Sequence, residues 1–254
     1  MPVAAGFIDS AAPDHVKVLV WTQAGAQYQW FASFVQRSGF TASTSDSSLF
    51  VYKEGADTAY LLLYIDDIIL TALSSALLRH ITELLHSEFA MTDLGDLHHF
   101  LGIAVTRSSC GLFLSQRQYA VDLLQRASIA ECHSTATPVD TRAKLSAIDG
   151  APVEDATQYR SLAGALQYLT VTRPDLAYAV QQVCLFMHDP CEPHLAMLKR
   201  VLWYMKGTLS TGLHIGVGGI NSLTAYSHAD WAGCQESRRS TSGYCFFLGN
   251  NLVS

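Results

Sequence analysis

Two adjacent aspartates stand in the most apolar part of this 254-residue sequence. Asp66 and Asp67 interrupt the run LLLYIDDIILTA, which otherwise has the composition of buried β-strand. The order strand, Asp-Asp, strand predicts a tight hairpin with both carboxylates at its tip. Two explanations for the pair are open. Aspartate is frequent in turns because its side chain bonds to nearby backbone, and adjacent carboxylates also suit a divalent cation that offsets their repulsion.

A magnesium site would give the pair a chemical role. Mg²⁺ prefers carboxylate oxygens together with substrate phosphates. In two-metal sites such ions activate one oxygen and stabilise the leaving one during phosphoryl transfer. A site of this kind needs a further carboxylate from elsewhere in the chain, so its composition depends on the elements around the hairpin.

The residues around the hairpin predict a mixed α+β fold. Residues 1–24 show no clear period and are expected to be irregular. The apolar spacing then predicts the following elements: a helix over Gln27–Phe40, strands at Ser47–Lys53, Thr58–Tyr64 and Ile68–Ala72, an amphipathic helix over Ser75–Phe89, strands around HFLGIAVT and GLFLSQ, and a helix over Gln116–Ile129.

The expected secondary structure changes twice in the second half of the chain. Residues 134–155 are polar and contain Pro, Gly and Asp, which predicts a long connector. Three helices are expected next, over Asp155–Val171, Pro174–Met187 and Pro193–Lys206. Short strands in LHIGVG, LTAYSHADW and TSGYCFFLG then follow. The chain therefore reads as a mixed α+β part, a helical part and the start of a β-rich part.

The composition limits the classes of protein to consider. The chain is 49% hydrophobic, and 22 acidic against 16 basic side chains give a net charge of −6, which by itself argues against a nucleic-acid partner. Six cysteines without a CxxC pair favour a reduced, intracellular setting over a zinc ribbon or a disulfide framework. The sequence shows no signal-peptide pattern and no apolar run long enough to span a membrane.

The segment YIDD (Tyr64–Asp67) resembles the Y-x-D-D signature of reverse transcriptases. The flanking segments resemble the polyprotein of copia-type LTR retrotransposons, in the order expected for that family, from about Gly6 to Ser254. They are SDSSLFVYKEGADTAYLLLYIDDIILTA, FAMTDLGDLHHFLGIAV, GLFLSQRQYAVDLL, STATPVD, YRSLAGALQYLTVTRPDLAYAV and HLAMLKRVLWYMKGTLSTGL. YSHADWAG and RRSTSGYCFFLGNNLVS resemble the opening of the ribonuclease H domain that follows in the family.

The resemblance implies a fold and its domains. It implies an α+β chain with a partial polymerase palm and thumb over 1–133, a linker over 134–154, a helical connection over 155–210 and a truncated ribonuclease H-like start over 211–254. The helix from Gln116 would belong to the thumb. The family further implies an RNA template and a DNA primer as partners, no membrane, and an intracellular location, either cytoplasmic within a virus-like particle or nuclear.

The resemblance also implies roles for individual residues. Asp66 would be the principal Mg²⁺ ligand and Asp67 a neighbouring one. Tyr64 would lie near the primer end. The segment FLGI matches the primer-grip hairpin, so Phe100, Leu101 and Gly102 are also expected near the primer. The implied reaction is RNA-directed nucleotidyl transfer.

The sequence departs from the family in its first 30 residues. The palm's other essential aspartate belongs to a K-x-D-V-x-x-A-F segment upstream of the stretch that GFIDSAAPDHV resembles, and Asp9 and Asp14 match the connector instead. The block L-Y-G-L-K-Q-A-P-R-A-W is replaced by LVWTQAGAQYQW. We therefore expect the chain to be catalytically incompetent without this aspartate and the fingers. One alternative is a partner chain that supplies them, and another is a non-catalytic nucleic-acid- or protein-binding module.

The ribonuclease H-like segment departs as well. The family stretch reads Y-[ST]-D-x-D-W-A-G, and here His228 replaces the first catalytic aspartate. Imidazole is a poor ligand for Mg²⁺. Asp230 matches the second, less telling aspartate of the stretch, so the sequence predicts no working ribonuclease H site.

The sequence also gives expectations for the basic residues, for two aromatic residues and for the edge of the hairpin. Arg173, Lys199, Arg200 and Lys206 either cover a solvated helix surface or line a weak backbone-binding face. Trp203 and Tyr204 either pack in the core or stack on bases. Without the first palm strands, the hairpin Thr58–Ala72 is expected to have an unpaired edge and an exposed apolar face.

Overall fold

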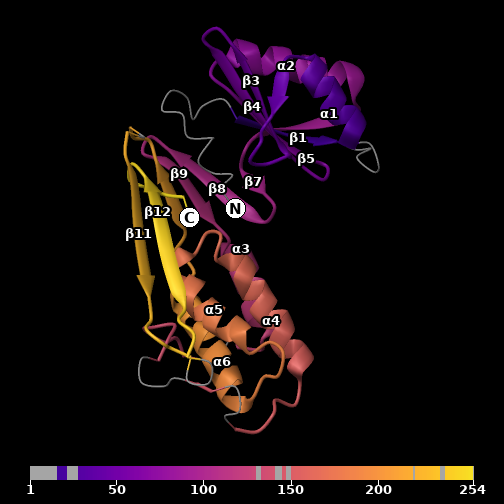
Figure 1. Ribbon diagram of the computed structural model, residues 1–254. Helices are drawn as coiled ribbons and strands as arrows, with labels where there is room; N and C mark the ends of the chain where they lie inside the picture. Colours follow the sequence, from indigo (N-terminus) through magenta and orange to yellow (C-terminus); the bar gives the residue numbers. More distant parts are fainter. Residues whose placement is uncertain are drawn as a thin grey trace.

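The computed structural model describes residues 16–21, 28–129, 133–140, 145–146, 150–219, 221–234 and 238–253. Figure 1 shows a six-stranded sheet with helices α1 and α2 at one end of the molecule and the helices α3 to α6 at the other. A four-stranded sheet lies between them, and a three-stranded sheet lies at the side. The chain is therefore a mixed α+β protein, as the sequence predicts.

The six-stranded sheet is antiparallel and has the order β2-β3-β4-β5-β1-β6. Its strands are β1 (Val16–Trp21), β2 (Phe40–Ala42), β3 (Leu49–Glu54), β4 (Asp57–Tyr64), β5 (Asp67–Ala72) and β6 (Met91–Asp96). The prediction that residues 1–24 are irregular is wrong for 16–21. The segment VKVLVW forms β1, an inner strand between β5 and β6. Residues 1–15 lie outside the described part of the chain.

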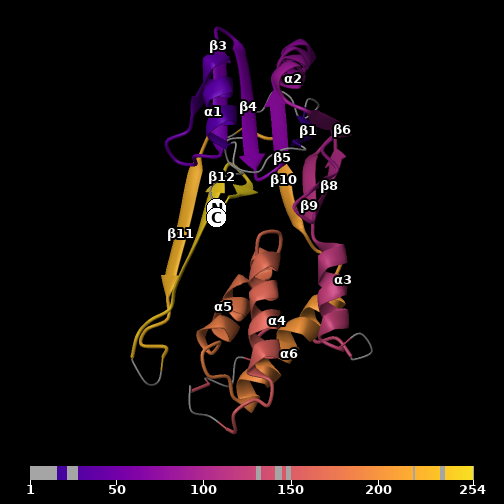
Figure 2. The ribbon, with the colours of Figure 1, turned by 90° about the vertical axis from the view of Figure 1, so that its right-hand side faces the viewer.

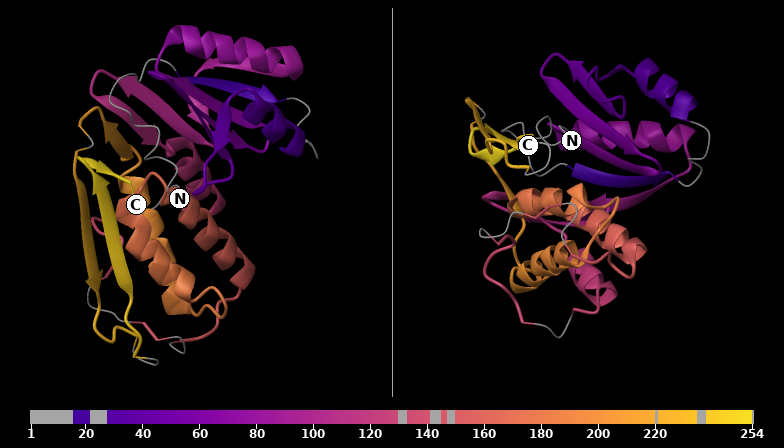
Figure 3. Two further views of the ribbon diagram at one scale, coloured as in Figure 1. Left: turned by 45° about the horizontal axis from the view of Figure 1, so that its top comes forward. Right: turned by 60° about the horizontal axis from the view of Figure 1, so that its bottom comes forward.

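Helices α1 (Tyr28–Arg37) and α2 (Ser75–Glu88) cover one face of this sheet, and Figure 3 shows the sheet and both helices from two further sides. The side chain of Ser74 caps α2 by accepting a hydrogen bond from the Leu77 backbone at 3.2 Å. The buried side chains of α2 recur at helical spacing, which confirms the amphipathic helix. Together with alternate residues of β4 and β5 they form one apolar core.

The expected unpaired edge of the hairpin is not found. β4 pairs with β3, and β5 pairs with β1 through five residue pairs from Val16–Thr71 to Val20–Asp67. Every residue of β5 from Ile68 to Ala72 is buried, on both faces of the strand. Because β1 occupies the position beside β5, the aspartate hairpin lies inside the sheet and has neighbours on both sides.

The four-stranded sheet has the order β10-β9-β8-β7. Its strands are β7 (His99–Phe100), β8 (Ile103–Ser108), β9 (Gly111–Ser115) and β10 (Leu213–Gly216). A turn at Leu101 and Gly102 divides HFLGIAVT into a hairpin of β7 and β8, where the strand pattern predicts a single strand. β10 comes from a distant part of the sequence and pairs with β9.

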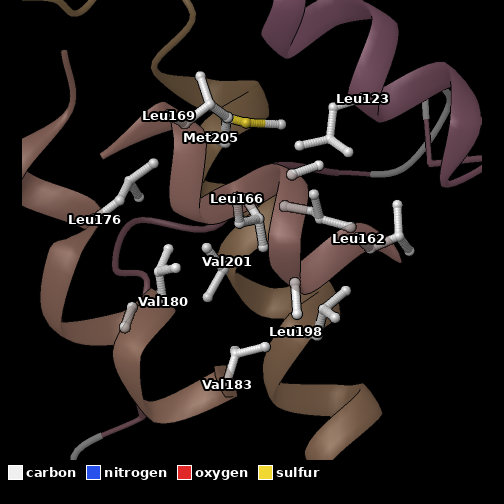
Figure 4. Packing of buried hydrophobic residues seen from close by; sticks show 14 of the residues in the cluster. Leu123, Leu162, Leu166, Leu169, Leu176, Val180, Val183, Leu198, Val201 and Met205 are labelled. Atoms are coloured by element: carbon white, nitrogen blue, oxygen red, sulfur yellow. The ribbon is translucent and has the colours of Figure 1, made fainter. Parts of the chain in front are cut away.

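The helical part has a single apolar core, shown in Figure 4. It is built by α3 (Arg117–Arg126), α4 (Ala156–Leu169), the 3-10 turn η2 (Pro174–Leu176), α5 (Ala177–Leu185) and α6 (Glu192–Gly207). Leu166 of α4 lies near its centre, among side chains from the other helices. Since α3 contributes Leu123 and Leu124 to this core, it packs with α4 and α6 and belongs to the helical part.

The three-stranded sheet contains β11 (Leu223–Ala229), β12 (Ser242–Leu248) and β13 (Asn251–Leu252), all antiparallel. All seven residues of β11 are exposed. Asn251 joins this sheet to β10, because its side chain accepts from Gly216 N at 2.7 Å and donates to Gly216 O at 3.1 Å. No described helix is long and apolar enough to cross a membrane.

Candidate active site

The two aspartates lie at the tip of a β-hairpin with a two-residue turn, as the sequence predicts. β4 ends at Tyr64, β5 begins at Asp67, and these two residues are paired across the hairpin. Ile65 and Asp66 form the turn, and Ile65 has a φ of 56°. A β-branched residue rarely adopts this left-handed conformation. The turn therefore holds Asp66 with a locally strained backbone, which is a feature common at functional sites.

The alternation of side chains along β5 places Asp67 on the sheet face away from α1 and α2. Ile68 and Leu70 belong to the core beneath those helices, so Asp67 points to the opposite side. Tyr64 is the cross-strand partner of Asp67 in β4, and Val20 is its partner in β1. Cross-strand partners share a face, so Tyr64, Asp67 and Val20 form a row across the sheet.

The charges at the tip are close together. Partial burial raises the pKa of Asp67, and the neighbouring charge of Asp66 raises it further. Asp66 is exposed, and its backbone carbonyl accepts a hydrogen bond from Trp21 N at 2.8 Å. This bond attaches the hairpin tip to the end of β1. The arrangement presents two carboxylates whose repulsion a bound cation would relieve.

A third carboxylate is missing from this arrangement among the described residues. The strand beside β5 presents Val20 to Asp67, and the next strand places Asp93 opposite Leu19, on the helix-covered face. Asp93 already forms an ion pair with Lys17, whose Nζ lies 2.5 Å from its carboxylate. No three His, Cys, Asp or Glu side chains gather closely enough to share a metal ion in this part of the chain. Asp9 and Asp14 lie outside the described residues.

The turn predicted to lie near the primer is held by a helix from the second half of the chain. Tyr168, near the end of α4, donates a hydrogen bond from its hydroxyl group to the carbonyl of Leu101. Burial raises the pKa of Tyr168, and nearby Tyr119 and Tyr64 raise it further. Tyr168 is therefore held by the β7–β8 turn on one side and by burial among the helices on the other. Sequence reasoning did not single out Tyr168, because its position depends on folding across many residues.

His228, which the resemblance places at the position of a ribonuclease H aspartate, lies within exposed β11. The Asp230 side chain accepts a hydrogen bond from Thr241 N, and its own backbone N–H donates to Thr241 O at 3.1 Å. Asp230 thus fixes the connection between β11 and β12. Because His228 lies on an open strand without a described carboxylate cluster, this segment shows no metal-binding arrangement in the described residues.

The expectation that Arg173 lies on a solvated helix surface or on a backbone-binding face is wrong. Its side chain is 3% exposed and forms two hydrogen bonds with Asp175, so it belongs to neither a solvated surface nor a backbone-binding face. Arg200 donates to Thr137 Oγ1 at 2.9 Å. Trp203 and Tyr204 pack partly buried against the helical core, as core packing predicts.

Comparison with known proteins identifies the family. Residues 16–141 match the family described as reverse transcriptase (RNA-dependent DNA polymerase). The Pol polyprotein of transposon RE2 from Arabidopsis thaliana is 41% identical over 255 residues, which cover 98% of this chain and 18% of that protein. The Pol polyprotein of transposon TNT 1-94 from Nicotiana tabacum is 32% identical over 238 residues, 89% of this chain and 18% of that protein.

The chain belongs to the reverse transcriptase family of copia-type retrotransposon Pol polyproteins. It spans less than a fifth of the length of the Pol polyproteins it matches. An uncharacterized mitochondrial protein of Arabidopsis thaliana is 47% identical over 195 residues, 77% of this chain and 81% of that protein. No solved structure is significantly similar to the chain.

The reverse transcriptase match includes the hairpin with Asp66 and Asp67 and the turn at Leu101 and Gly102. Tyr168 lies beyond the matched residues but within the stretch that aligns with the Pol polyproteins, since that alignment covers 98% of the chain. The reverse transcriptase region and the helices after it therefore belong to one continuous resemblance.

Proposed function

We propose that this chain carries half of a reverse transcriptase active site and does not extend a primer on its own. The half that is present is the hairpin with Asp66 and Asp67, within a palm, and α3 to α6 serve as thumb and connection. The observation that carries this proposal is the pairing of Asp67 with Val20. The place beside the hairpin that would suit a third carboxylate holds an apolar side chain.

The donor set fits magnesium only in part. Two carboxylates are the right chemistry, and the pKa of Asp67 is raised by its partial burial and by the neighbouring charge of Asp66. Two ligands from adjacent residues cannot fix two ions in the geometry that in-line transfer needs. Magnesium, when bound, supplies activation of the attacking oxygen and stabilisation of the leaving one.

Each of the chain's own residues has a part in this proposal. Asp66 and Asp67 would bind a cation at the exposed tip of the hairpin. Tyr64 shares the face of Asp67 and would contact the end of a DNA primer paired to an RNA template. The β7–β8 turn, with Leu101 and Gly102, would support the primer strand from the opposite side.

The ribonuclease H-like segment is proposed to be inactive. His228 takes the place of the aspartate that would bind the metal, and imidazole binds Mg²⁺ poorly. Asp230 is engaged with the backbone of Thr241 and stabilises a loop instead. The hairpin with Asp66 and Asp67, which we call the polymerase half-site, is therefore the part of the chain whose metal binding is to be tested.

Metal binding tests the half-site directly. In a Mn²⁺ titration followed by electron paramagnetic resonance, the purified chain should bind weakly, and the double variant Asp66→Asn, Asp67→Asn should lose this binding. Val20→Asp should raise the affinity on the order of tenfold by adding a charged ligand beside Asp67. Val20→Asn is the matched control with the same shape and no charge.

Two results would contradict the proposal. Unchanged Mn²⁺ binding in the double aspartate variant would place the metal elsewhere. Equal affinities for Val20→Asp and Val20→Asn would mean that position 20 does not face Asp67.

A further inference from the structure

Tyr168 connects the helical core to the four-stranded sheet. It lies near the end of α4, and Figure 2 shows α4 rising from the far end of the helices toward the sheets. Its hydroxyl group donates to the carbonyl of Leu101, which is 67 residues earlier in the sequence. One phenol thus ties the helical part to the tip of the β7–β8 hairpin.

The ring of Tyr168 is itself held within the helical part. Tyr119 of α3 packs edge-on against it, with the ring centroids 5.2 Å apart. The hydroxyl group of Tyr119 donates to Ala165 O in α4 at 3.3 Å, so it bonds inside the helical part. The two phenols are in contact, but their hydroxyl groups bind different partners. Only the bond of Tyr168 reaches the β7–β8 turn.

The turn that Tyr168 binds needs support. Leu101 has a φ of 51° and Gly102 a φ of 73°. A leucine in the left-handed region is unfavourable and persists where its surroundings enforce it. A hydrogen bond to the Leu101 carbonyl fixes the orientation of the peptide between Leu101 and Gly102, and so the direction in which the turn projects.

Tyr168 also has an electrostatic link to the strand that carries the aspartate hairpin. The charge of Tyr64 contributes to the raised pKa of Tyr168, after burial and Tyr119, and Tyr64 shares a sheet face with Asp67. The β7–β8 turn and the end of α4 therefore meet at Tyr168. A movement of the helices against the four-stranded sheet would be transmitted to the β7–β8 turn at this point.

We propose that Tyr168 is a positioning residue that couples the helical part to primer binding by holding the Leu101 carbonyl, and thereby the orientation of the β7–β8 turn. The proposal rests on the proposed function, since the turn is taken to support a primer. It adds a residue from α4 that does not touch the reacting atoms and acts through Leu101.

The test compares Tyr168→Phe with Tyr119→Phe in the full chain. Both variants remove one hydroxyl group and keep the ring, so the contact between the two rings remains. The first readout is the Gly102 amide signal in a ¹⁵N–¹H NMR spectrum, because this nitrogen is bonded to the Leu101 carbonyl carbon. The second readout is the Kd for a fluorescently labelled DNA primer annealed to an RNA template, measured by anisotropy at fixed salt.

Tyr168→Phe should shift or broaden the Gly102 signal and raise the Kd about threefold to tenfold, the effect of one lost hydrogen bond. Tyr119→Phe should leave the Gly102 signal in place and change the Kd less than about twofold. An unmoved Gly102 signal in Tyr168→Phe would overturn the proposal, because the hydrogen bond would not exist in solution.

Two other outcomes separate this proposal from the proposed function. If the unmodified chain binds the primer–template and Tyr168→Phe binds equally well despite a moved Gly102 signal, the coupling is overturned and the proposed function stands. If the unmodified chain does not bind at all, the proposed function fails, and the coupling to a primer fails with it.

Discussion

Arg173 and Asp175 form a two-pronged ion pair at the junction of α4, η2 and α6. Arg173 Nε lies 2.9 Å from Asp175 Oδ1, and Nη2 lies 2.7 Å from Oδ2. Two further donors of the guanidinium bind Thr208, at 3.0 Å to its carbonyl and 2.7 Å to its hydroxyl group. The ring of Tyr204 lies 5.9 Å from the guanidinium carbon, and its hydroxyl group donates to Asp175. The side chains of Arg173 and Asp175 thus link the end of α4, η2 and the end of α6 inside the helical part.

Removal of Asp175 should destabilise the chain. Asp175→Ala leaves the buried guanidinium of Arg173 without its counter-charge, and we expect a loss of about 1.5–3 kcal/mol in the free energy of unfolding. Asp140→Ala is the control, because Asp140 lies 4.0 Å from Arg200 in a more exposed pair and should cost less than about 1 kcal/mol. Urea unfolding measures both. Equal losses would show that the guanidinium is not held as described.

The same pair predicts a dependence of stability on pH. Burial by itself would raise the pKa of Asp175, but the hydrogen bonds and charge of Arg173 and the Tyr204 hydroxyl group bring it below its ordinary value. A lowered pKa in the folded state stabilises the protein above about pH 4, the pKa of an unfolded aspartate, and this stabilisation disappears as the pH falls through the folded value. The difference in unfolding free energy between the unmodified chain and Asp175→Asn should therefore shrink below about pH 4. A constant difference down to pH 2 would refute the assignment.

Gly111 tests whether β10 belongs to the four-stranded sheet. Gly111 has a φ of 134°, and a Cβ there would lie 2.0 Å from the Ile215 carbonyl oxygen in β10. Gly55 has a φ of 59° with open space around it, so Gly55→Ala carries the backbone cost alone, about 1–2 kcal/mol. Gly111→Ala should cost a further ~1–3 kcal/mol through the clash with β10. If the two variants melt alike, β10 does not pair with β9 in solution.

Ile65 should carry strain that glycine relieves. Ile65 is 73% exposed, so little packing is lost on its replacement. Ile65→Gly should raise the free energy of unfolding by about 0.5–1 kcal/mol, the left-handed penalty less the entropy cost of glycine. Ile65→Val keeps the β-branch and should leave stability unchanged. Thermal unfolding of the three proteins decides this, and a destabilised Ile65→Gly would argue against a left-handed residue at the tip.

The elements next to the candidate site differed in how well the sequence predicted them. The β4–β5 hairpin was predictable, because two apolar strands enclose a two-residue turn. β1 was not recognised, because an inner strand buried on both faces has no alternation, and VKVLVW is short. Its position beside β5 removes the expected unpaired edge and puts Val20 against Asp67.

Two side chains were unpredictable for a different reason. Arginine is mostly exposed in proteins, so nothing in the sequence marks Arg173 as buried. The bond from Tyr168 to Leu101 depends on how α4 packs against the four-stranded sheet, which no local pattern encodes. Sequence motifs located the charged residues of the candidate site, and tertiary packing determines which residues surround them.

Primer extension tests the central claim most directly. The purified chain is incubated with a labelled DNA primer on an RNA template and all four deoxynucleotides, in Mg²⁺ and then in Mn²⁺, beside the Asp66→Asn, Asp67→Asn variant. We predict no extension from either protein, because the β1 partner of Asp67 is the apolar Val20 and the proposed site lacks a third carboxylate. Extension by the unmodified chain that disappears in the variant would contradict this account and would mean that another carboxylate completes the site.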